Sequence, residues 1–398
     1  MKRLLAILVI GILAGAGTAA RADEMGEAIL RGLVRRGIIT QTDADAIRAD
    51  ALKEVASAHA SAEAPVGAVG GAAAAGQNRT TITGYIQARA TFQKNVQPSS
   101  NFLVRRARLR ISHRTENGRF VLSLDGGQNN TKVRDAYFDW HITPRRNHVA
   151  GWTLRSGQFL YPFGAEIERS SADREFPELP AGWSTLFPHT RDQGFNVSRG
   201  LSRTTDFDLA ITNGRSVRQA GRLQDTDNYK DLIARIHHSL NPRAEASISL
   251  YQGQQTVSGM HIDRKRWAVA AHAEDVAGGE ARAEYIGARD MALNLGEGDP
   301  YGTAPARAWF ASYEHPLSNS LSLAARYASF DPDTDNRFRL DGDGEIRSWG
   351  IAAIQDVDDH IRLTVAWESP KLTLYDRALQ QGRSRTDDLL TLQGQYRF

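Results

Sequence analysis

The sequence predicts an all-β protein, a transmembrane antiparallel β-barrel of about sixteen strands. Two observations carry this prediction. Apolar and polar residues alternate over most of the chain after residue 80, and short links between these runs alternate with long polar ones. Strict alternation is typical of strands that have one face in lipid and one in water. No apolar run of about eighteen residues follows the N-terminus, which excludes a helical membrane protein.

The stretch from Asp387 to Phe398 shows the pattern most clearly. One of its faces is apolar or aromatic, and the other is mostly polar; the apolar face carries Leu390, Leu392, Gly394, Tyr396 and Phe398. Aromatic side chains are typical of the membrane–water boundary of a barrel. This stretch also resembles the terminal recognition strand of bacterial outer-membrane proteins. The resemblance implies that the barrel assembly machinery binds the chain through the strand ending at Phe398.

The segment 1–22 has the features of a signal peptide. Lys2 and Arg3 precede an apolar run, Leu4–Ala16, that is too short to span a membrane comfortably. Cleavage is expected after Ala22, with Ala20 as the alternative. The chain has no cysteine, which fits an exported protein.

The segment 23–60 reads as a periplasmic helical hairpin or coiled coil, because apolar residues recur there with helical spacing. A spacer is favoured over an element that assembles subunits. The segment 61–79 is rich in Ala and Gly and reads as a flexible linker. The barrel domain is predicted over 80–398.

Alternating runs recur along the whole barrel domain. They lie near residues 80–92, 106–111, 120–124, 136–142, 150–159, 192–199, 205–213, 229–239, 244–252, 264–274, 280–289, 305–315, 320–330, 345–355, 360–369 and 388–398. Their number is about sixteen, and bacterial single-chain barrels have an even number of strands.

The links between these runs predict the orientation of the barrel. Short turns are expected at 115–118, 200–203, 241–243, 316–319 and 356–359, and long external loops at 214–228, 290–304, 331–344 and 370–387. The longest link, at about 160–190, follows the fifth strand. It is expected to fold into the lumen and narrow it.

Five arginines are expected to line the lumen. If apolar faces point to lipid, the side chains that point inward include Arg89, Arg106, Arg108, Arg110 and Arg155. Arg on the lipid face near the midplane costs about 2–4 kcal/mol, which favours the inward assignment. The three on the second strand form a ladder of fixed charge that attracts anions and predicts an anion preference.

Two alternatives apply to these charges. The arginines could instead pair with lumenal acids and hold the wall together, and the candidate acids are Asp125, Asp135, Asp139 and Glu284. The inward loop also carries several acids, Glu166, Glu168, Asp173, Glu175 and Glu178, against Arg169 and Arg174. Acids facing an arginine wall give a transverse field, and the same acids could tether the loop by ion pairs.

The stretch Leu154–Glu166 resembles a signature of the phosphate-selective porin O/P family. Gly157, Gln158, Phe159, Pro162, Phe163, Gly164 and Glu166 match it, and Ala165 replaces the usual Leu. Weaker matches occur in the expected order at 84–85, 105–109, 135–137, 191–194 and 213–214. The resemblance implies a trimeric, sixteen-stranded outer-membrane channel surrounded by lipid and lipopolysaccharide. It also implies phosphate or polyphosphate as the best-known solutes of the family.

Other chemistry has little support in the sequence. The acids at 331–345 do not have the spacing of a calcium-binding EF-hand, and a solvated loop is favoured. His237 and His238 are adjacent on a strand, face opposite sides and cannot bind one metal ion. No catalytic residues, metal site, cofactor or nucleic-acid partner is therefore expected.

The leading hypothesis is a passive porin for small anions. The alternatives are a general diffusion porin with weak selectivity, a barrel enzyme, or an envelope structural protein whose N-terminal segment binds a periplasmic partner.

Overall fold

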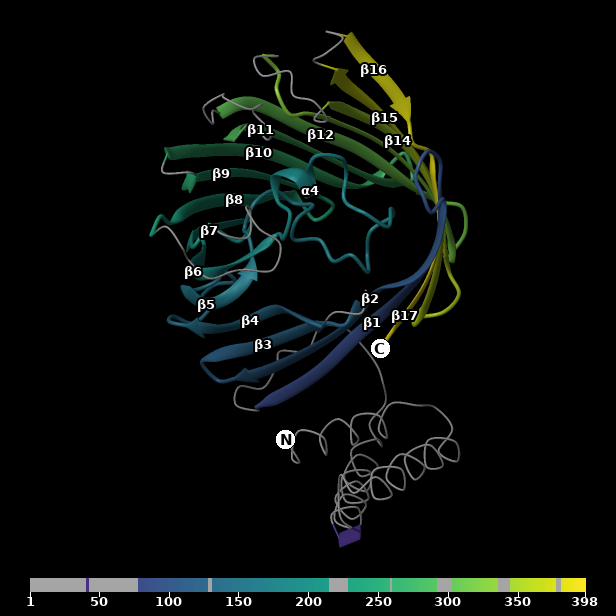
Figure 1. The fold of residues 1–398 in the computed structure, drawn as a ribbon. Coiled ribbons are helices and arrows are strands. Elements are labelled where there is room, and N and C mark those ends of the chain that lie inside the picture. Colours follow the sequence, from purple (N-terminus) through teal and green to yellow (C-terminus); the bar gives the residue numbers. More distant parts are fainter. Residues whose placement is uncertain are drawn as a thin grey trace. The chain divides into compact units, whose positions relative to one another are not determined.

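The computed structural model describes residues 41–42, 78–127, 131–214, 228–257, 260–291, 303–335, 344–376 and 381–398 (Figure 1). The chain divides into two compact units, Met1–Ala74 and Ala75–Phe398. Only Gln41 and Thr42 are described in the first unit, where both are helical and exposed. The rest of the predicted signal peptide, helical segment and linker lies outside the described residues, apart from the last two linker residues. None of the helices described is long and apolar enough to cross a bilayer.

The second unit is a β-barrel with one short helix, α4 (Trp183–Leu186). Its strand segments are β1 (Arg79–Gln93), β2 (Ser100–Thr115), β3 (Gly118–Asp125), β4 (Lys132–His141), β5 (Thr153–Leu160), β6 (Arg191–Gly200), β7 (Thr205–Thr212), β8 (Asp231–Asn241), β9 (Ala244–Val257), β10 (Met260–Val276), β11 (Gly279–Met291), β12 (Thr303–Pro316), β13 (Leu321–Asp331), β14 (Glu345–Asp356), β15 (Ile361–Asp376), β16 (Gln381–Thr386) and β17 (Leu389–Arg397).

The barrel is closed by pairing of β1 with both β2 and β17. Every neighbouring pair is antiparallel, and Gly84 and Phe398 exchange backbone hydrogen bonds at the seam. Both β16 and β17 pair with β15, at Lys371–Thr386 and at Glu368–Leu389. They are therefore two parts of one strand, and the barrel has sixteen strands, which confirms the predicted fold class.

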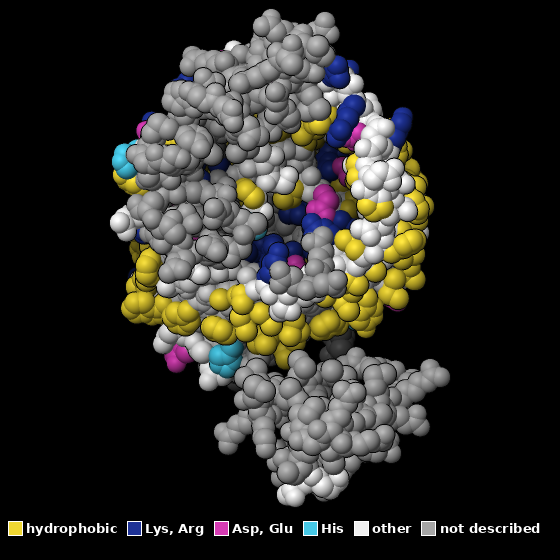
Figure 2. Space-filling view, in the orientation of Figure 1, with side chains coloured by type: hydrophobic (Ala, Val, Ile, Leu, Met, Phe, Trp, Pro, Cys, Tyr) yellow, Lys and Arg dark blue, Asp and Glu magenta, His cyan; other side chains and the backbone are white. Residues whose placement is uncertain are grey.

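The outer surface of the barrel is apolar. In β17, Leu390, Leu392 and Tyr396 are exposed, whereas Thr391 and Gln393 are buried. The faces of this strand are therefore the ones that the alternation predicts. Figure 2 shows apolar side chains around the outside of the barrel, with Lys, Arg, Asp and Glu gathered in its interior.

The link between β5 and β6, residues 161–190, lies inside the barrel (Figure 1). Its Tyr161, Phe163, Trp183 and Phe187 are fully buried. They pack in one apolar cluster with side chains of the wall, among them Tyr251, Ile286, Ala308, Phe310 and Phe330. This packing holds the loop against β9–β13 and leaves open space on the opposite side of the lumen.

One of the predicted links differs from the structure. The external loop expected at 370–387 is mostly strand, because β15 continues to Asp376 and β16 begins at Gln381. The alternation is lost there because the strands extend beyond the apolar band, where both faces meet water. The link between β4 and β5, from Ile142 to Trp152, is longer than the other turns at its end of the barrel.

Candidate functional site: an arginine-lined passage beside the inward loop

A cavity of about 620 Å³ lies between the inward loop and the wall formed by the first strands. Among the described residues that line it are nine arginines and five carboxylates. The arginines are Arg105, Arg106, Arg108, Arg110, Arg134, Arg169, Arg174, Arg191 and Arg397, and the acids are Asp125, Asp135, Glu168, Asp173 and Glu178. The lining therefore carries a formal excess of positive charge.

A β-bulge in β2 adds an arginine to this lining. Gln87 of β1 pairs with Arg106, and Ala88 pairs with Val104, so Arg105 has no partner across the ladder. A bulge re-aims the side chain of its extra residue. Arg105 consequently faces the lumen beside Arg106, although strict alternation would place these two neighbours on opposite faces.

Three arginines converge on one loop carboxylate, Glu178. Its oxygens lie 2.5 Å from Arg89 Nη1, 2.7 Å from Arg105 Nε and 3.2 Å from Arg106 Nη2. Arg89 also donates to the carbonyl oxygen of Pro177 at 2.7 Å. Arg106 is only 5% exposed. Arg89 and Arg106 therefore tie the loop to the wall.

The charges around Glu178 determine its ionisation. Burial opposes loss of the proton, but Arg106, Arg89 and Arg105 outweigh it and lower the pKa of Glu178 to about 2. The carboxylate is therefore ionised throughout the physiological pH range.

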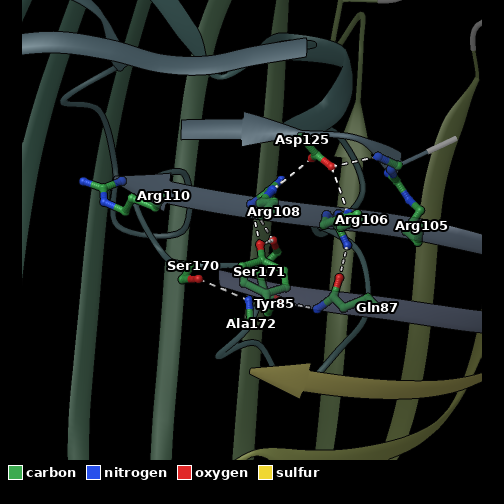
Figure 3. A network of polar contacts seen from close by, with 12 residues as sticks. Tyr85, Gln87, Arg105, Arg106, Arg108, Arg110, Asp125, Ser170, Ser171 and Ala172 are labelled. Carbon is green, nitrogen blue, oxygen red and sulfur yellow. Dashed lines mark hydrogen bonds and ion pairs between the residues drawn. The ribbon is translucent and has the colours of Figure 1, made fainter. Parts of the chain in front are cut away.

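Arg108 connects three elements (Figure 3). Its Nε donates to Asp125 of β3 at 2.9 Å, and its Nη1 donates to the hydroxyls of Tyr85 in β1 and Ser171 in the loop. Gln87 accepts from Arg106 and donates to the Ser171 carbonyl oxygen at 2.9 Å. The middle of the ladder is therefore a network that positions the loop.

The remaining two predicted arginines are also paired. Arg110 lies 3.4 Å from Asp135, and its side chain keeps 39% of its exposure. Arg155 donates to Asp139 at 2.7 Å and stacks over the ring of Tyr137. All five predicted arginines thus contact a carboxylate, and Arg110 is the most exposed of them.

The candidate acid partners divide into two groups. Asp125, Asp135 and Asp139 bind arginines, as the structural alternative expects. Among the residues that the structure describes, Glu284 pairs with no arginine, so the expected pairing is wrong for this acid. Its Oε2 instead accepts the backbone N–H groups of Ala165 and Glu166, at 3.0 and 2.9 Å.

The signature residues of the loop are buried in its seat and do not line the cavity. Pro162 and Phe163 are buried, and the Phe163 ring lies 4.9 Å from that of Phe187. Gly164 has a φ of 65°, and a Cβ there would meet Glu284 Oε1 at 2.1 Å. A glycine is needed at this position because the backbone is left-handed and passes against a carboxylate.

The loop acids are largely neutralised. Glu166 and Glu175 are buried and pair with Arg174 at 2.9 Å and Arg169 at 2.5 Å. Glu168 and Asp173 are exposed and pair with wall arginines, Arg235 and Arg397. The loop is thus held by ion pairs on both sides, and any transverse field comes from partly compensated charges.

Of the arginines that line the cavity, the sequence prediction did not include four. Arg105 and Arg134 sit at bulges, where alternation fails. Arg191 begins β6 and pairs with Asp135 at 2.7 Å, and Arg397 ends β17 and pairs with Asp173 at 3.5 Å. The only sequence signal was the high share of arginine, which outnumbers lysine about six to one.

A comparison with known protein families gives one match. Residues 81–261 match the family described as phosphate-selective porin O and P. No curated protein matches the chain.

Several solved structures share the fold. The anion-selective porin from Comamonas acidovorans has a TM-score of 0.61 at 10% identity, covering 81% of this chain and 100% of its own. The outer-membrane channel DcaP of Acinetobacter baumannii has a TM-score of 0.62 at 15% identity, and the match covers 83% of this chain and 100% of DcaP. OmpT of Vibrio cholerae in its trimer form has a TM-score of 0.56 at 9% identity, and the match covers 81% of this chain and 99% of OmpT.

At these identities the likeness to the solved structures is one of fold. The resemblance predicted from the sequence is confirmed: residues 81–261 match the phosphate-selective porin O and P family, and the chain has the sixteen-stranded barrel fold of solved porins.

Proposed function

We propose that this protein is a passive, anion-preferring diffusion channel of the outer membrane. The observation that carries the proposal is the excess of arginine over carboxylate in the lining of the cavity. A lumenal wall with surplus positive charge raises the local concentration of anions and lowers that of cations. The solutes are small anions, with phosphate or polyphosphate as the candidates that the family name suggests.

The preference is expected to be moderate. Each of the five predicted arginines contacts a carboxylate, so much of the lumenal charge is compensated. This compensation favours the second candidate function, a general diffusion porin with weak selectivity. It also supports a channel over an enzyme, because these side chains hold the wall and loop in place.

The proposed setting is that of an outer-membrane porin. We propose secretion with a signal peptide at 1–22, a periplasmic segment before the barrel, and assembly through the barrel machinery. Contacts with lipid and lipopolysaccharide follow from the apolar outer surface. One structural neighbour is described as a trimer, which supports a homotrimer here; the folded protein should then migrate as a heat-modifiable, SDS-resistant trimer.

The test is the zero-current potential of the purified channel in a planar bilayer under a KCl gradient. A potential of the sign set by chloride is expected, and it should decrease at high salt, where the Debye length is about 3 Å at 1 M. A potential set by potassium would contradict the anion preference. An absence of channels from correctly folded protein would contradict the porin itself.

A further inference from the structure

A second bulge, in β4, places another arginine in the passage. Asp135 pairs with Ser123 of β3, and Val133 pairs with Leu124, which leaves Arg134 as the extra residue. The following residues on this strand alternate regularly, with Phe138 exposed on the outside and Asp139 buried. Without the bulge, Arg134 would share the face of Phe138. It instead lines the same cavity as Arg105.

Arg134 differs from the other lining arginines in its contacts. The other eight each form an ion pair with a carboxylate. Arg134 forms no hydrogen bond or ion pair through its guanidinium with any residue that the structure describes, and its Nε is fully buried. The side chain is half-buried, and a ligand that enters the cavity can supply the partner that its positive charge lacks among the described residues.

The charges around Arg134 do not supply the missing partner. Arg191, Arg108, Asp125 and Asp135 are the charged groups that act on it most strongly. Both acids are already engaged, Asp125 by Arg108 at 2.9 Å and Asp135 by Arg191 at 2.7 Å. The positive charge of Arg134 therefore adds to a local surplus.

A second unpaired group lines the same cavity. His189, near the end of the inward loop, has a buried Nε2 without a hydrogen-bond partner among the described residues. Burial and the positive charges of Arg134 and Lys132 lower the pKa of His189. Its ring is therefore neutral near pH 7, and a bound anion would favour its protonated, donating form.

We propose that Arg134, with His189 beside it, forms an oxyanion-binding site in the passage. The inference rests on the proposed anion channel and names the site that the ladder of paired arginines does not provide. The ligand class is a small oxyanion, a phosphate or a carboxylate, because a planar guanidinium donates two parallel hydrogen bonds to such groups.

The test compares single substitutions in the full-length channel. Chloride conductance is measured in a planar bilayer while inorganic phosphate or acetate is added, and the half-blocking concentration is read. Arg134→Ala removes the site, and Arg134→Lys keeps the charge but loses the planar fork. Arg243→Ala is the control, because Arg243 also has an ionic partner, Asp275, but does not line the passage. Heat-modifiable migration verifies that each variant is folded.

Saturable block of the natural protein is expected, with a half-blocking concentration raised about tenfold in Arg134→Ala. Arg134→Lys should lie between the two, and Arg243→Ala should stay within about twofold of the natural protein. Block by phosphate alone would identify a phosphate site, and block by both probes a general oxyanion site.

Equal block in Arg134→Ala and the natural protein would overturn the inference. So would an equal loss in Arg243→Ala, or no saturable block of the natural protein by either probe. The KCl-gradient potential of the natural protein is measured separately. An anion-set potential without saturable block would leave the proposed function standing and remove only the site.

Discussion

Arg105 Nε donates a 2.7 Å hydrogen bond to Glu178 Oε1, although Arg105 directly precedes Arg106, which faces the same lumen. The bulge that permits this brings a third guanidinium to one loop carboxylate. Three arginines from two adjacent strands thus share one anchor. Removal of one partner from such a group leaves charge uncompensated, which is costly when the site is shielded from water.

Substitution of Glu178 should loosen the inward loop. In Glu178→Ala, Arg89, Arg105 and Arg106 lose their common partner and repel one another. We expect a larger single-channel conductance and more current noise. Glu178→Gln is the control that keeps the shape, and it should show a smaller effect. Conductance and noise equal to those of the natural channel in both variants would contradict this role of the anchor.

Acid should act on the same anchor. The pKa of Glu178 is lowered from 4.5 to about 2, so its ion pairs contribute stability that is fully present above pH 4.5 and is lost as the pH falls toward 2. We expect quiet channels at pH 4 and increased noise below about pH 3. In Glu178→Gln this increase in current noise should be absent, because the amide does not titrate. An equal increase in noise in both proteins would show that a group other than Glu178 titrates.

The arginine ladder gives a contrasting expectation. Replacement of Arg106, Arg108 and Arg110 by Ala removes three charges and leaves Asp125 without its ion pair. The zero-current potential should therefore move toward cation preference, and the shift should shrink at 1 M salt, where the Debye length is about 3 Å. Because Arg106 also ties the loop, conductance should change as well. An unchanged potential at low salt would show that these three side chains only hold the wall and loop together and do not set the ion preference.

The contact between the inward loop and the wall leaves no room for a side chain at Gly164. Gly164→Ala forces a Cβ against Glu284 at 2.1 Å in a left-handed backbone, a strain of about 1–3 kcal/mol. We expect a lower thermal unfolding temperature, followed by heat-modifiable migration. Gly394→Ala is the matched control, since its Cβ would meet only Leu363 at an ordinary 3.9 Å. An equal shift in both variants would indicate a general effect of the substitution and not strain at the seat.

Alternation along the sequence predicts which face a residue occupies only while the strand is regular. It places Leu392 outward and Gln393 inward in β17, as the structure has them. It fails at Arg105 and Arg134, because a bulge shifts the count by one and depends on how the neighbouring strand pairs. Local sequence carries no information on that pairing.

The partners of the arginines were only partly predictable. Opposite charges on adjacent strands, such as Arg108 and Asp125, can be proposed from the order of the strands. The contact of Glu178 with Arg89 joins a loop to a distant strand, so it depends on how the loop packs inside the barrel. For the same reason, the lack of a partner for Arg134 is visible only in three dimensions.

The seam between β1 and β17 has a consequence for the order of folding. Gln87 and Arg89 of β1 bond to Gln395 and Gln393 of β17, and Gln395 also reaches the Ala172 carbonyl oxygen in the loop. These contacts join residues separated by about three hundred positions. Closing so long a loop costs much conformational entropy, so we expect these contacts to form late in folding. The loop cannot complete its attachment before the barrel closes. The narrow part of the passage is therefore among the last features to form.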